Sequence, residues 1–438
     1  MSTVDLLADL EAIGRTPRGG YTRLAWDPAT MALREWFAAQ AAALGLELTE
    51  DGNGNQVAWW GTGPNGLLVG SHLDSVPEGG PLDGPLGVAS AFAAVAGLRA
   101  EGWTPARPLG VVNFADEEGG RFGIACLGSR LATGALDAGR AFALRDDAGT
   151  SLAEAMRAQG RDPRAAGPSA WLDDVSSYIE LHVEQGRWLA PRGAAVGVAS
   201  AIWPHGRYRF DFCGEGNHAG ATAMADRHDP MLAYAATVLA ARELASGVDR
   251  IRNRPQLGPD QMGDGSELGP DQIGDGSELG PDQIGDGSEL GPGEARATFG
   301  RLRVEPGSTN SIPSRVSAWL DARASHSRTL ESTVAGIVAR AKAAAVAEGT
   351  TVEFTTESAS DAVAFDVDLR HRLAALLDAP VLATGAGHDA GILAARLPTA
   401  MLFVRNPTGV SHAPEESAEP EDIEAGTAAL ARVIRELA

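Results

Sequence analysis

Imidazole and carboxylate side chains recur in four short motifs, and each motif follows an apolar stretch of the chain. Ligands of an open α/β sheet bind just beyond the carboxyl ends of its strands, so motifs in this position can converge on one crevice. Taken alone, each motif is more typical of a solvated turn or a hydrogen-bonded histidine. Their joint occurrence favours a site for zinc, manganese or cobalt, which imidazole and carboxylate ligands suit. The motifs are GSHLDSVPEGGPLDGPLGV (His72, Asp74, Asp83), NFADEEGGRFG (Glu117, Glu118), ELHVEQG (His182, Gln185) and GVSHAPEE (His412).

The elements that would position these motifs alternate between short apolar strands and Ala-rich helices. Such alternation indicates an α/β domain with a largely parallel sheet. The predicted elements are strands at 67–71, 109–115, 178–182 and 400–404 and helices at 27–44, 86–100, 129–133 and 419–437.

A different pattern begins near residue 200. Its β-α-β-β order is typical of a small α+β domain, here inserted into the larger one. We place the metal-carrying α/β domain at 1–199 and 326–438 and the insert at 200–325. Bending at the two linkers would let the insert close as a lid. The elements predicted for the insert are strands at 207–213, 297–304 and 315–323 and a helix at 229–245.

An acidic tandem repeat lies inside the insert, at 257–289. Three consecutive copies of LGPDQ(M/I)GDGSE each carry three acidic residues and no basic residue. This composition is typical of a flexible, solvated surface loop. A calcium-binding array and a short stacked coil are alternatives, although the D-x-D-x-D-G spacing of a calcium loop is missing. We predict no catalytic role for the repeat.

The composition excludes several classes of partner. With 36 basic and 58 acidic residues, the chain has a formal net charge of −22, which would repel nucleic acid and anionic membranes. The first residues lack the basic and apolar regions of a secretory signal, and no apolar stretch reaches the length of a membrane span. The two cysteines, Cys126 and Cys213, provide no disulfide framework. We therefore expect a soluble cytoplasmic protein.

The ordered motifs resemble those of a known clan. HLD, the DG at Asp83, DEEGGRFG, HVEQG and SHAP are similar to motifs of the dinuclear metallopeptidase clan, which includes aminoacylases and carboxypeptidases. More narrowly, the chain resembles the branch of N-carbamoyl-L-amino-acid hydrolases, β-ureidopropionases and allantoate amidohydrolases, over nearly its whole length outside the repeat. The resemblance implies a homodimeric hydrolase with two divalent ions per subunit. Its substrate would be a small N-carbamoyl, ureido, N-acyl or N-formyl L-amino acid with a free carboxylate, cleaved at a C–N bond.

The resemblance also implies a role for each side chain of the four motifs. Asp83 would bridge the two ions, and Asp74 would orient the imidazole of His72. Glu117 would be the general base that takes a proton from water and passes it to the leaving nitrogen. The implied metal ligands are His72, Asp83, Glu118, His182 and His412.

The insert carries residues that the resemblance places at the substrate. In GEGNHAGATAMADRHDP, His218 would reach a site across a dimer interface and stabilise the oxyanion of the tetrahedral intermediate. In TNSIPSRVSAWLDAR, Asn310 and Arg323 would hold the substrate carboxylate, for which the planar fork of arginine is suited. Gln185 of the third motif would also contact the substrate. The plainer interpretations are a helix cap at Asn217–His218 and a surface salt bridge at Arg323.

Several interpretations of the substrate stay open. Residues 202–206 are Ile-Trp-Pro-His-Gly where many relatives of this branch carry a Gly-Gln-Arg stretch, so Trp203 and His205 would change the fit and weaken an allantoate assignment. A dipeptidase or aminoacylase of the same clan would use the same metal chemistry with another pocket. A non-catalytic metal-binding protein is the alternative of another class, although an unbound base such as Glu117 would serve no purpose there. The loop 387–390 (Gly-His-Asp-Ala) also matches the family, without an assigned role.

Overall fold

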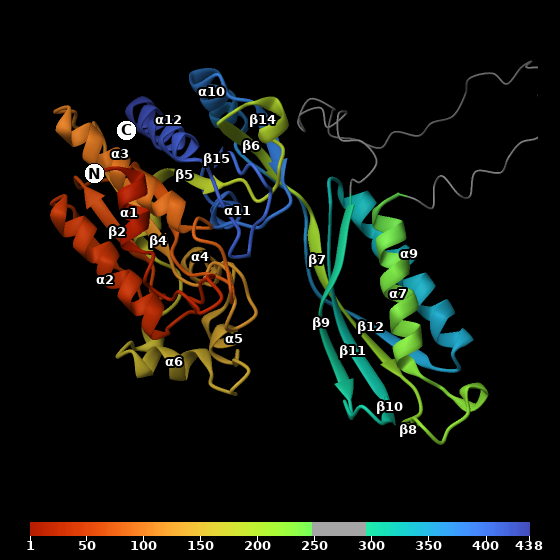
Figure 1. The fold of residues 1–438 in the computed structure, drawn as a ribbon. Coiled ribbons are helices and arrows are strands. Elements are labelled where there is room, and N and C mark those ends of the chain that lie inside the picture. Colours follow the sequence, from red (N-terminus) through yellow and green to blue (C-terminus); the bar gives the residue numbers. More distant parts are fainter. Residues whose placement is uncertain (248–294) are drawn as a thin grey trace, which may run out of the picture. The chain divides into compact units, whose positions relative to one another are not determined.

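The chain forms two compact units in a computed structural model that describes residues 1–247 and 295–438 (Figure 1). Unit 1 comprises Met1–Ile202 and Val363–Ala438, and unit 2 comprises Trp203–Ala362. The predicted α/β domain with a smaller inserted α+β domain is confirmed. The repeat predicted at 257–289 lies outside the described residues.

Unit 1 contains a nine-stranded sheet in the order β1-β2-β4-β3-β5-β15-β6-β13, with β14 paired to β6. Its four central strands are parallel: β4 (Leu109–Phe114), β3 (Gly66–His72), β5 (Val175–Val183) and β15 (Thr399–Val404). Nearly all their residues are buried, because both faces of the sheet are covered. The flanking strands are β1 (Glu47–Glu50), β2 (Gln56–Trp60), β6 (Val196–Ile202), β13 (Val363–Ala364) and β14 (Val381–Thr384).

Two hydrophobic cores lie on the two faces of this sheet. Successive residues of β3 point to opposite faces, so Leu67 and Val69 join one core and Leu68 joins the other. The first core contains residues of α1 (Thr3–Asp9), α2 (Pro28–Ala43), α3 (Pro85–Ala100), α10 (Val367–Leu377) and α12 (Pro420–Leu437), and the second contains residues of α4 (Leu127–Thr133) and α11 (Asp389–Leu393).

None of the helices within 1–247 and 295–438 is long and apolar enough to cross a membrane.

Helix α3 begins at Pro85, and Gly84 separates this helix from Asp83. Gly84 has a φ of +86°, a conformation that other residues rarely adopt. A Cβ at Gly84 would lie 2.4 Å from Cε1 of His72, which is far inside van der Waals contact. The Asp-Gly pair therefore meets both a backbone requirement and a space requirement beside the His72 ring.

Unit 2 has a four-stranded antiparallel sheet in the order β12-β7-β11-β9, with two helices on one face (Figure 1). Phe210 and Phe212 of β7 pack against Ile337 of α9 in the core between sheet and helices. The elements are β7 (His205–Cys213), β9 (Ala295–Glu305), β11 (Arg315–Ala324), β12 (Thr351–Ser360), α7 (Pro230–Ala245) and α9 (Ser327–Ala347), with a short ribbon of β8 (Asn217–His218) and β10 (Ser311–Ile312).

The predicted end of the insert at 325 is wrong. Unit 2 begins at Trp203 and continues to Ala362, because α9 packs on the same core as α7 and β12 pairs with β7. The Ala-rich pattern of α9 is typical of a helix but does not show which sheet that helix covers. The boundary therefore depends on a packing choice that the local sequence does not reveal.

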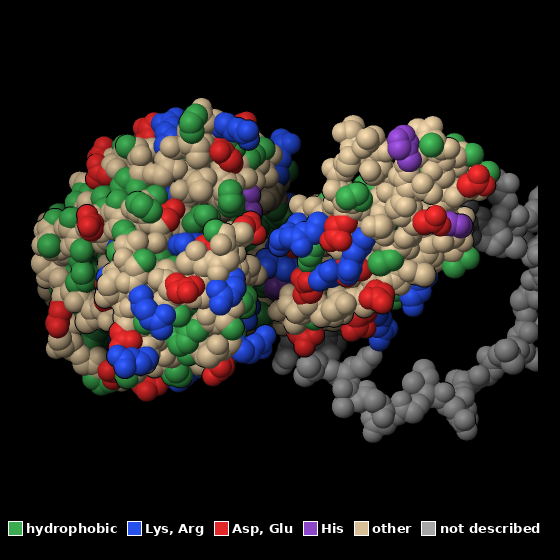
Figure 2. Space-filling model, turned by 90° about the horizontal axis from the view of Figure 1, so that it is seen from below, with side chains coloured by type: hydrophobic (Ala, Val, Ile, Leu, Met, Phe, Trp, Pro, Cys, Tyr) green, Lys and Arg blue, Asp and Glu red, His purple; other side chains and the backbone are tan. Residues whose placement is uncertain are grey.

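Acidic and basic side chains are interspersed on the faces that Figure 2 shows. Basic side chains gather on one part of unit 2 in this view, and acidic side chains lie among them. Within unit 2, Arg209 and Arg315 both contact Asp211 at 2.9 Å. Neighbouring carboxylates thus compensate part of the positive charge of this unit.

Candidate metal centre

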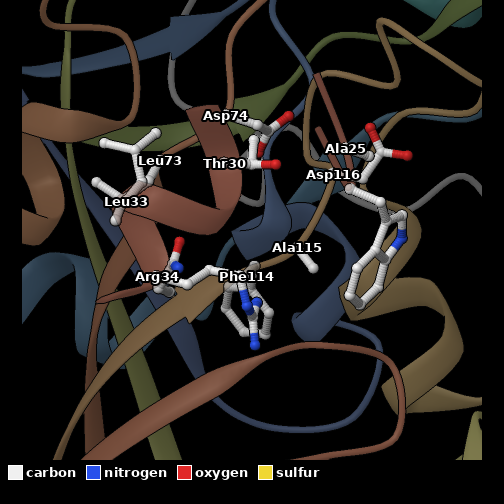
Figure 3. A pocket seen from close by; sticks show the side chains of 11 residues that line it. Ala25, Thr30, Leu33, Arg34, Leu73, Asp74, Phe114, Ala115 and Asp116 are labelled. Atoms are coloured by element: carbon white, nitrogen blue, oxygen red, sulfur yellow. The ribbon is translucent and has the colours of Figure 1, made fainter. Parts of the chain in front are cut away.

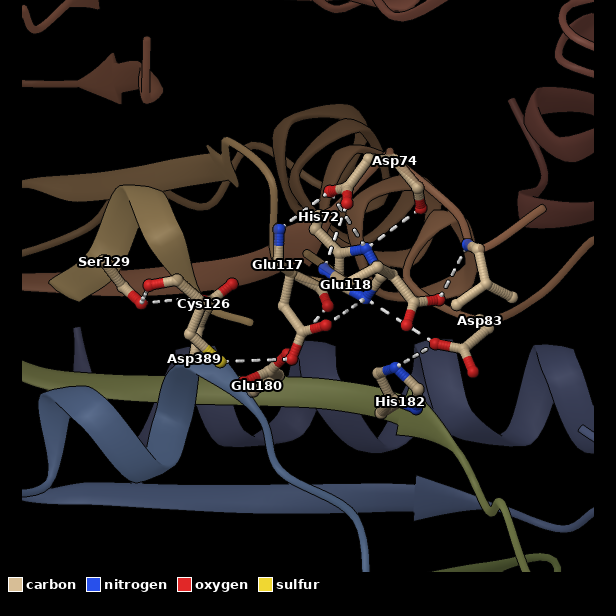
Figure 4. Close-up of polar contacts among 12 residues, drawn as sticks. His72, Asp74, Asp83, Glu117, Glu118, Cys126, Ser129, Glu180, His182 and Asp389 are labelled. Carbon is tan, nitrogen blue, oxygen red and sulfur yellow. Dashed lines mark hydrogen bonds and ion pairs between the residues drawn. The ribbon is translucent and has the colours of Figure 1, made fainter. Parts of the chain in front are cut away.

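The predicted motifs lie at the ends of the central strands of unit 1, and Figure 4 shows residues of the first three motifs together. His72 is the last residue of β3, and His182 is the last but one of β5. Glu117 and Glu118 follow the end of β4, and His412 lies in the loop after β15. Because these four strands are adjacent and parallel, their carboxyl ends bring the motifs together.

Two buried imidazoles face one oxygen of the Asp83 carboxylate (Figure 4). Asp83 Oδ1 lies 3.1 Å from Nε2 of His182 and 3.6 Å from Nε2 of His72. The other ring nitrogen faces a backbone carbonyl oxygen in each case: Nδ1 of His72 is 3.2 Å from that of Asp74, and Nδ1 of His182 is 2.8 Å from that of Val183. A carbonyl only accepts hydrogen bonds, so in the neutral form of each ring Nδ1 carries the proton and Nε2 presents a lone pair.

Two lone pairs and a carboxylate oxygen that face one another form the donor set of a cation site. Neither Nε2 atom makes a hydrogen bond within the described parts of the chain, although both rings are fully buried. Burial opposes a charge on His72, but nearby carboxylates, Glu117 foremost, raise its pKa well above the usual range. The cluster thus attracts positive charge, and His72, Asp83 and His182 fit a divalent metal ion.

The second oxygen of Asp83 belongs to a second group. Nε2 of His412 lies 3.4 Å from Asp83 Oδ2 and 3.3 Å from Glu118 Oε2. The contact with Asp83 raises the pKa of His412 to about 9, and burial raises the pKa of Glu118 to about 7. The His412 side chain is 48% exposed, whereas that of Asp83 is 4% exposed. Asp83, Glu118 and His412 therefore fit a second cation nearer to solvent, and Asp83 is common to both groups.

Asp74 connects the first group to the segment that follows β4 (Figure 4). Its Oδ1 accepts the backbone N–H of Glu117 at 3.1 Å, and its Oδ2 accepts that of Glu118 at 3.0 Å. The same Oδ1 lies 3.5 Å from Nδ1 of His72. Asp74 thus contacts His72 and also holds the backbone of the two glutamates.

Glu117 is buried beside the two groups and belongs to neither of them. Its Oε2 lies 3.8 Å from Nε2 of His72, and its Oε1 accepts a hydrogen bond from the thiol of Cys126 at 3.4 Å. Burial raises the pKa of Glu117 well above the usual range of a carboxyl. A carboxylate in this position can exchange a proton with a molecule that binds between the groups.

Gln185 lies against the shared carboxylate. Its Nε2 donates a hydrogen bond of 2.7 Å to Asp83 Oδ2. Its Oε1 is buried and has no hydrogen-bond partner among the residues that the structure describes. The amide is therefore positioned at the centre, and its contact with a substrate stays a prediction.

Three further buried acids surround the centre, and the sequence analysis assigned them no role. Glu180 accepts a hydrogen bond of 2.7 Å from the hydroxyl of a buried serine, and Asp389 accepts one of 2.5 Å from the hydroxyl of another. Glu416 accepts two backbone N–H groups of the loop that carries Asp83. The available signs were the position of Glu416 in the fourth motif and that of Asp389 beside His388, whose ring centroid lies 4.5 Å from that of His182.

In unit 2, His218 and Asn310 lie together at the ribbon of β8 and β10. Ser311, which follows Asn310, pairs with His218, and the carbonyl oxygen of Asn310 accepts the N–H of Ala219 at 2.9 Å. Both side chains are exposed. Nδ1 of His218 accepts the N–H of Gly220 at 3.1 Å. The proton of the neutral ring is therefore on Nε2, which can donate a hydrogen bond to an oxygen.

Arg323 lies at the opposite end of the sheet of unit 2. It pairs with His205 at the start of β7, whereas His218 follows the end of this nine-residue strand. About 27 Å of strand thus separates the two ends. The guanidinium of Arg323 makes two bonds, of 2.7 and 3.1 Å, to Asp321. The structure therefore does not bring His218 and Arg323 together in one subunit, so bending at the linkers cannot bring both to the same metal centre.

The residues that depart from the family pattern lie at the same end of unit 2 as Arg323. Nδ1 of His205 is 3.2 Å from the carbonyl oxygen of Trp203, and the guanidinium of Arg296 lies 5.6 Å from the centroid of the Trp203 ring. Trp203 and His205 thus form part of the local surroundings of Arg323 through the pairing of β7 with β11.

A small cavity in unit 1 lies beside Asp74 (Figure 3). Its volume is about 30 Å³, and its lining includes Arg34 of α2 and Asp116 but none of the candidate metal ligands. A cavity of this size holds about one or two water molecules. It is too small for an amino-acid derivative and is not the substrate site.

The comparisons with known proteins agree with this fold and site. Residues 68–436 match the family model of Peptidase family M20/M25/M40. The chain is 34% identical to an N-carbamoyl-L-amino acid amidohydrolase of Geobacillus stearothermophilus, over 99% of this chain and 97% of that protein. It is 30% identical to an allantoate amidohydrolase of Bacillus subtilis (strain 168), over 100% and 97%. The crystal structure of an amidase of the hydantoinase/carbamoylase family from Burkholderia vietnamiensis is similar with a TM-score of 0.82 and 27% identity, over 100% of this chain and 96% of that one.

An α/β sheet with four parallel central strands that carries two imidazole–carboxylate groups joined by one aspartate defines a metal-dependent hydrolase. The chain belongs to Peptidase family M20/M25/M40, a metal-dependent family. The resemblance identified from the ordered motifs is thus confirmed.

Proposed function

We propose that this protein is an amidohydrolase that uses two divalent metal ions to cleave a C–N bond of a small N-carbamoyl or ureido derivative of an L-amino acid. The observation that carries the proposal is the position of Asp83, whose two oxygens face two separate histidine-containing groups. By their names, the curated relatives act on N-carbamoyl-L-amino acids and on allantoate. Both kinds of compound contain a ureido-type C–N bond and a carboxylate.

One ion would be held by His72, Asp83 and His182, and the other by Asp83, Glu118 and His412. When bound, two such ions acidify water and polarise the carbonyl group of a substrate. Imidazole and carboxylate ligands suit zinc, manganese or cobalt. Because the side chain of His412 is the exposed one, a substrate would approach from its side.

Glu117 is the proposed general base. It lies 3.8 Å from His72 and outside both groups, so its carboxylate can take a proton from the attacking water and deliver it to the leaving nitrogen. The bond between its N–H and Asp74 holds its backbone in place during this transfer. A purely structural metal site would not need a buried carboxylate in this position, which argues against a non-catalytic role.

We also infer a homodimer in which each site takes residues from both subunits. His218 and Arg323 are separated by about 27 Å of strand, so one small substrate cannot contact both within one subunit. Arg323 of one subunit would hold the substrate carboxylate with its planar fork. His218 of the partner subunit would donate its Nε2–H to the carbonyl oxygen on which negative charge develops. Asn310, which lies beside His218, would enter the site with it, and Gln185 would contact the substrate from beside Asp83.

A dipeptidase or aminoacylase of the same family is the second candidate, and the names of the relatives favour the first. The test is a substrate panel for the metal-loaded protein: N-carbamoyl-L-amino acids, allantoate, N-formyl-L-glutamate, N-acetyl-L-amino acids and L-dipeptides. Ammonia release from a carbamoyl or ureido compound would support the proposal. New amino groups from the acetyl compounds or dipeptides alone would assign the second candidate. Absence of turnover on the whole panel, with two ions bound, would refute both.

A further inference from the structure

Glu416 joins the two loops that carry Asp83 and His412. It is 4% exposed and lies between β15 and α12, four residues after His412. Its Oε1 accepts the backbone N–H groups of Leu82 and Asp83, each at 2.9 Å, and its Oε2 accepts the hydroxyl of Ser411 at 2.9 Å. One carboxylate thus connects segments that are 333 positions apart in the sequence.

Ser411 lies between the carboxylates of Glu416 and Asp83. Its Oγ is 2.9 Å from Glu416 Oε2 and 3.1 Å from Asp83 Oδ2. A hydroxyl group has one proton to donate, so the two carboxylates share this donor. Asp83 is therefore held at its backbone by Glu416 and at its side chain by Ser411 and Gln185.

The chain provides space for this carboxylate at Gly80. A Cβ at Gly80 would lie 2.3 Å from Glu416 Oε1 and 2.6 Å from Glu416 Cβ. Carbon atoms in contact lie about 3.5–4.0 Å apart, so any larger residue at position 80 would displace Glu416. The loop before Asp83 is thus shaped around the Glu416 side chain.

The backbone of His412 adopts a left-handed conformation beside these contacts. Its φ is +54°, a left-handed value that is uncommon for a residue other than glycine. The hydroxyl of the preceding Ser411 is bound to Glu416, and the N–H of Glu416 donates to the carbonyl oxygen of Ala413 at 3.1 Å. Conformations of this kind persist where the surrounding structure holds them.

We propose that Glu416 is a positioning residue of the metal centre, which fixes Asp83 and His412 relative to each other and so sets the affinity for the ion between them. The inference rests on the proposed two-metal function. Removal of the carboxylate would release the backbone of Asp83 and the turn at Ser411 and His412 together. Substitution of a residue that hydrogen-bonds a metal ligand typically lowers metal affinity by about 10–100-fold. We expect an effect in this range for Glu416.

The test measures zinc binding, which does not require turnover. Competition with a chelator gives the affinity and the number of zinc ions for the wild type, Glu416→Ala and Glu416→Gln. Glu416→Ala should weaken the binding of at least one of the two zinc ions by about 10–100-fold. Glu416→Gln should weaken it less, because its amide oxygen can still accept the N–H groups of Leu82 and Asp83.

Asp51 provides a matched control. Its Oδ1 accepts the N–H groups of Asn53 and Asn55 at 3.0 and 2.9 Å, and its Oδ2 accepts the hydroxyl of Ser169 at 2.6 Å. It connects two loops as Glu416 does, and none of its described contacts involves a candidate metal ligand. Asp51→Ala should therefore lower the melting temperature and leave zinc affinity unchanged.

Wild-type zinc affinity in a folded Glu416→Ala variant would overturn the inference and leave Glu416 with a structural role only. Should Glu416→Ala not fold, Glu416→Gln is compared with Asp51→Asn, and equal zinc affinity of these two variants would overturn it as well. A wild-type protein that binds neither zinc, manganese nor cobalt would instead refute the metal centre on which the inference rests.

Discussion

The carboxylate of Asp74 holds the backbone of Glu117: the amide nitrogen of Glu117 lies 3.1 Å from Asp74 Oδ1, and that of Glu118 lies 3.0 Å from Asp74 Oδ2. Asp74 also follows His72 by two residues and contacts its ring. One buried side chain therefore fixes an imidazole of the first group, a carboxylate of the second and the proposed base. Asp74 therefore connects the end of β3 with the segment that follows β4.

Asp74→Asn should reduce catalysis without loss of the fold. Asparagine keeps the size of the side chain but offers one acceptor oxygen to two N–H groups. We expect kcat/KM to fall about 10–100-fold. The unsatisfied buried N–H group should lower the free energy of unfolding by about 1–3 kcal/mol. Steady-state kinetics and denaturant titration measure the two effects, and a wild-type kcat/KM would contradict the role of Asp74.

Glu117→Gln should lose turnover and keep its metal ions. Removal of a general base costs about 10²–10⁴-fold in kcat. Because Glu117 belongs to neither group, elemental analysis should still find two ions per subunit. Cys126→Ser, which replaces the thiol donor to Glu117 by a hydroxyl donor, is the control and should retain most of the activity. Retained turnover in Glu117→Gln would show that the base lies elsewhere, and lost metal would show that Glu117 is a ligand.

Gly84→Ala should destabilise unit 1 and weaken metal binding together. The added Cβ would lie 2.4 Å from the His72 ring, at a backbone φ of +86°. Strain of this kind costs about 1–3 kcal/mol. Gly97 lies in the same region of the chain, inside α3, and an added Cβ there would meet no described atom within 4 Å. Gly97→Ala should therefore raise the free energy of unfolding by about 0.5–1 kcal/mol. Denaturant titrations that change in the same direction for both variants would argue against this account of Gly84.

Two inactive variants should restore activity when their subunits are mixed. In a mixed dimer of His218→Ala and Arg323→Ala subunits, one of the two sites would combine an intact Arg323 with an intact His218 of the partner subunit. Random mixing yields half mixed dimers, so about a quarter of the wild-type activity should return. The measurement is ammonia release after the two variants are mixed and allowed to exchange subunits. If subunits are shown to exchange and no activity returns, a site shared between subunits is contradicted.

The sequence predicted that the motifs converge because they follow strand ends, whereas the two groups at Asp83 were implied by the family resemblance. His72 and His182 lie at the ends of apolar runs that read as buried strands, and adjacent parallel strands end at the same edge. Glu416 was not predicted, since it follows Glu415 in what reads as a solvated turn and its backbone partners are 333 positions away. Burial of such a carboxylate follows from tertiary packing and leaves no local pattern.

The arrangement of unit 2 was less predictable for a related reason. The separation of His218 and Arg323 depends on the length of β7 and on its register with β11. Register is set by cross-strand packing and by turns, and a strand pattern alone gives its ends only to within a few residues. The boundary at Ala362 depended in turn on which sheet α9 covers.

The central claim is that C–N bond cleavage depends on two divalent ions held in part by Asp83. Its most direct test is ammonia release from N-carbamoyl-L-amino acids before chelation, after chelation and after addition of manganese, zinc or cobalt, with the ions counted per subunit. The claim predicts that ammonia release disappears with the chelator and returns as two ions bind per subunit. Ammonia release that persists in the metal-free protein, or its absence for every N-carbamoyl and ureido substrate with two ions bound, would contradict the claim.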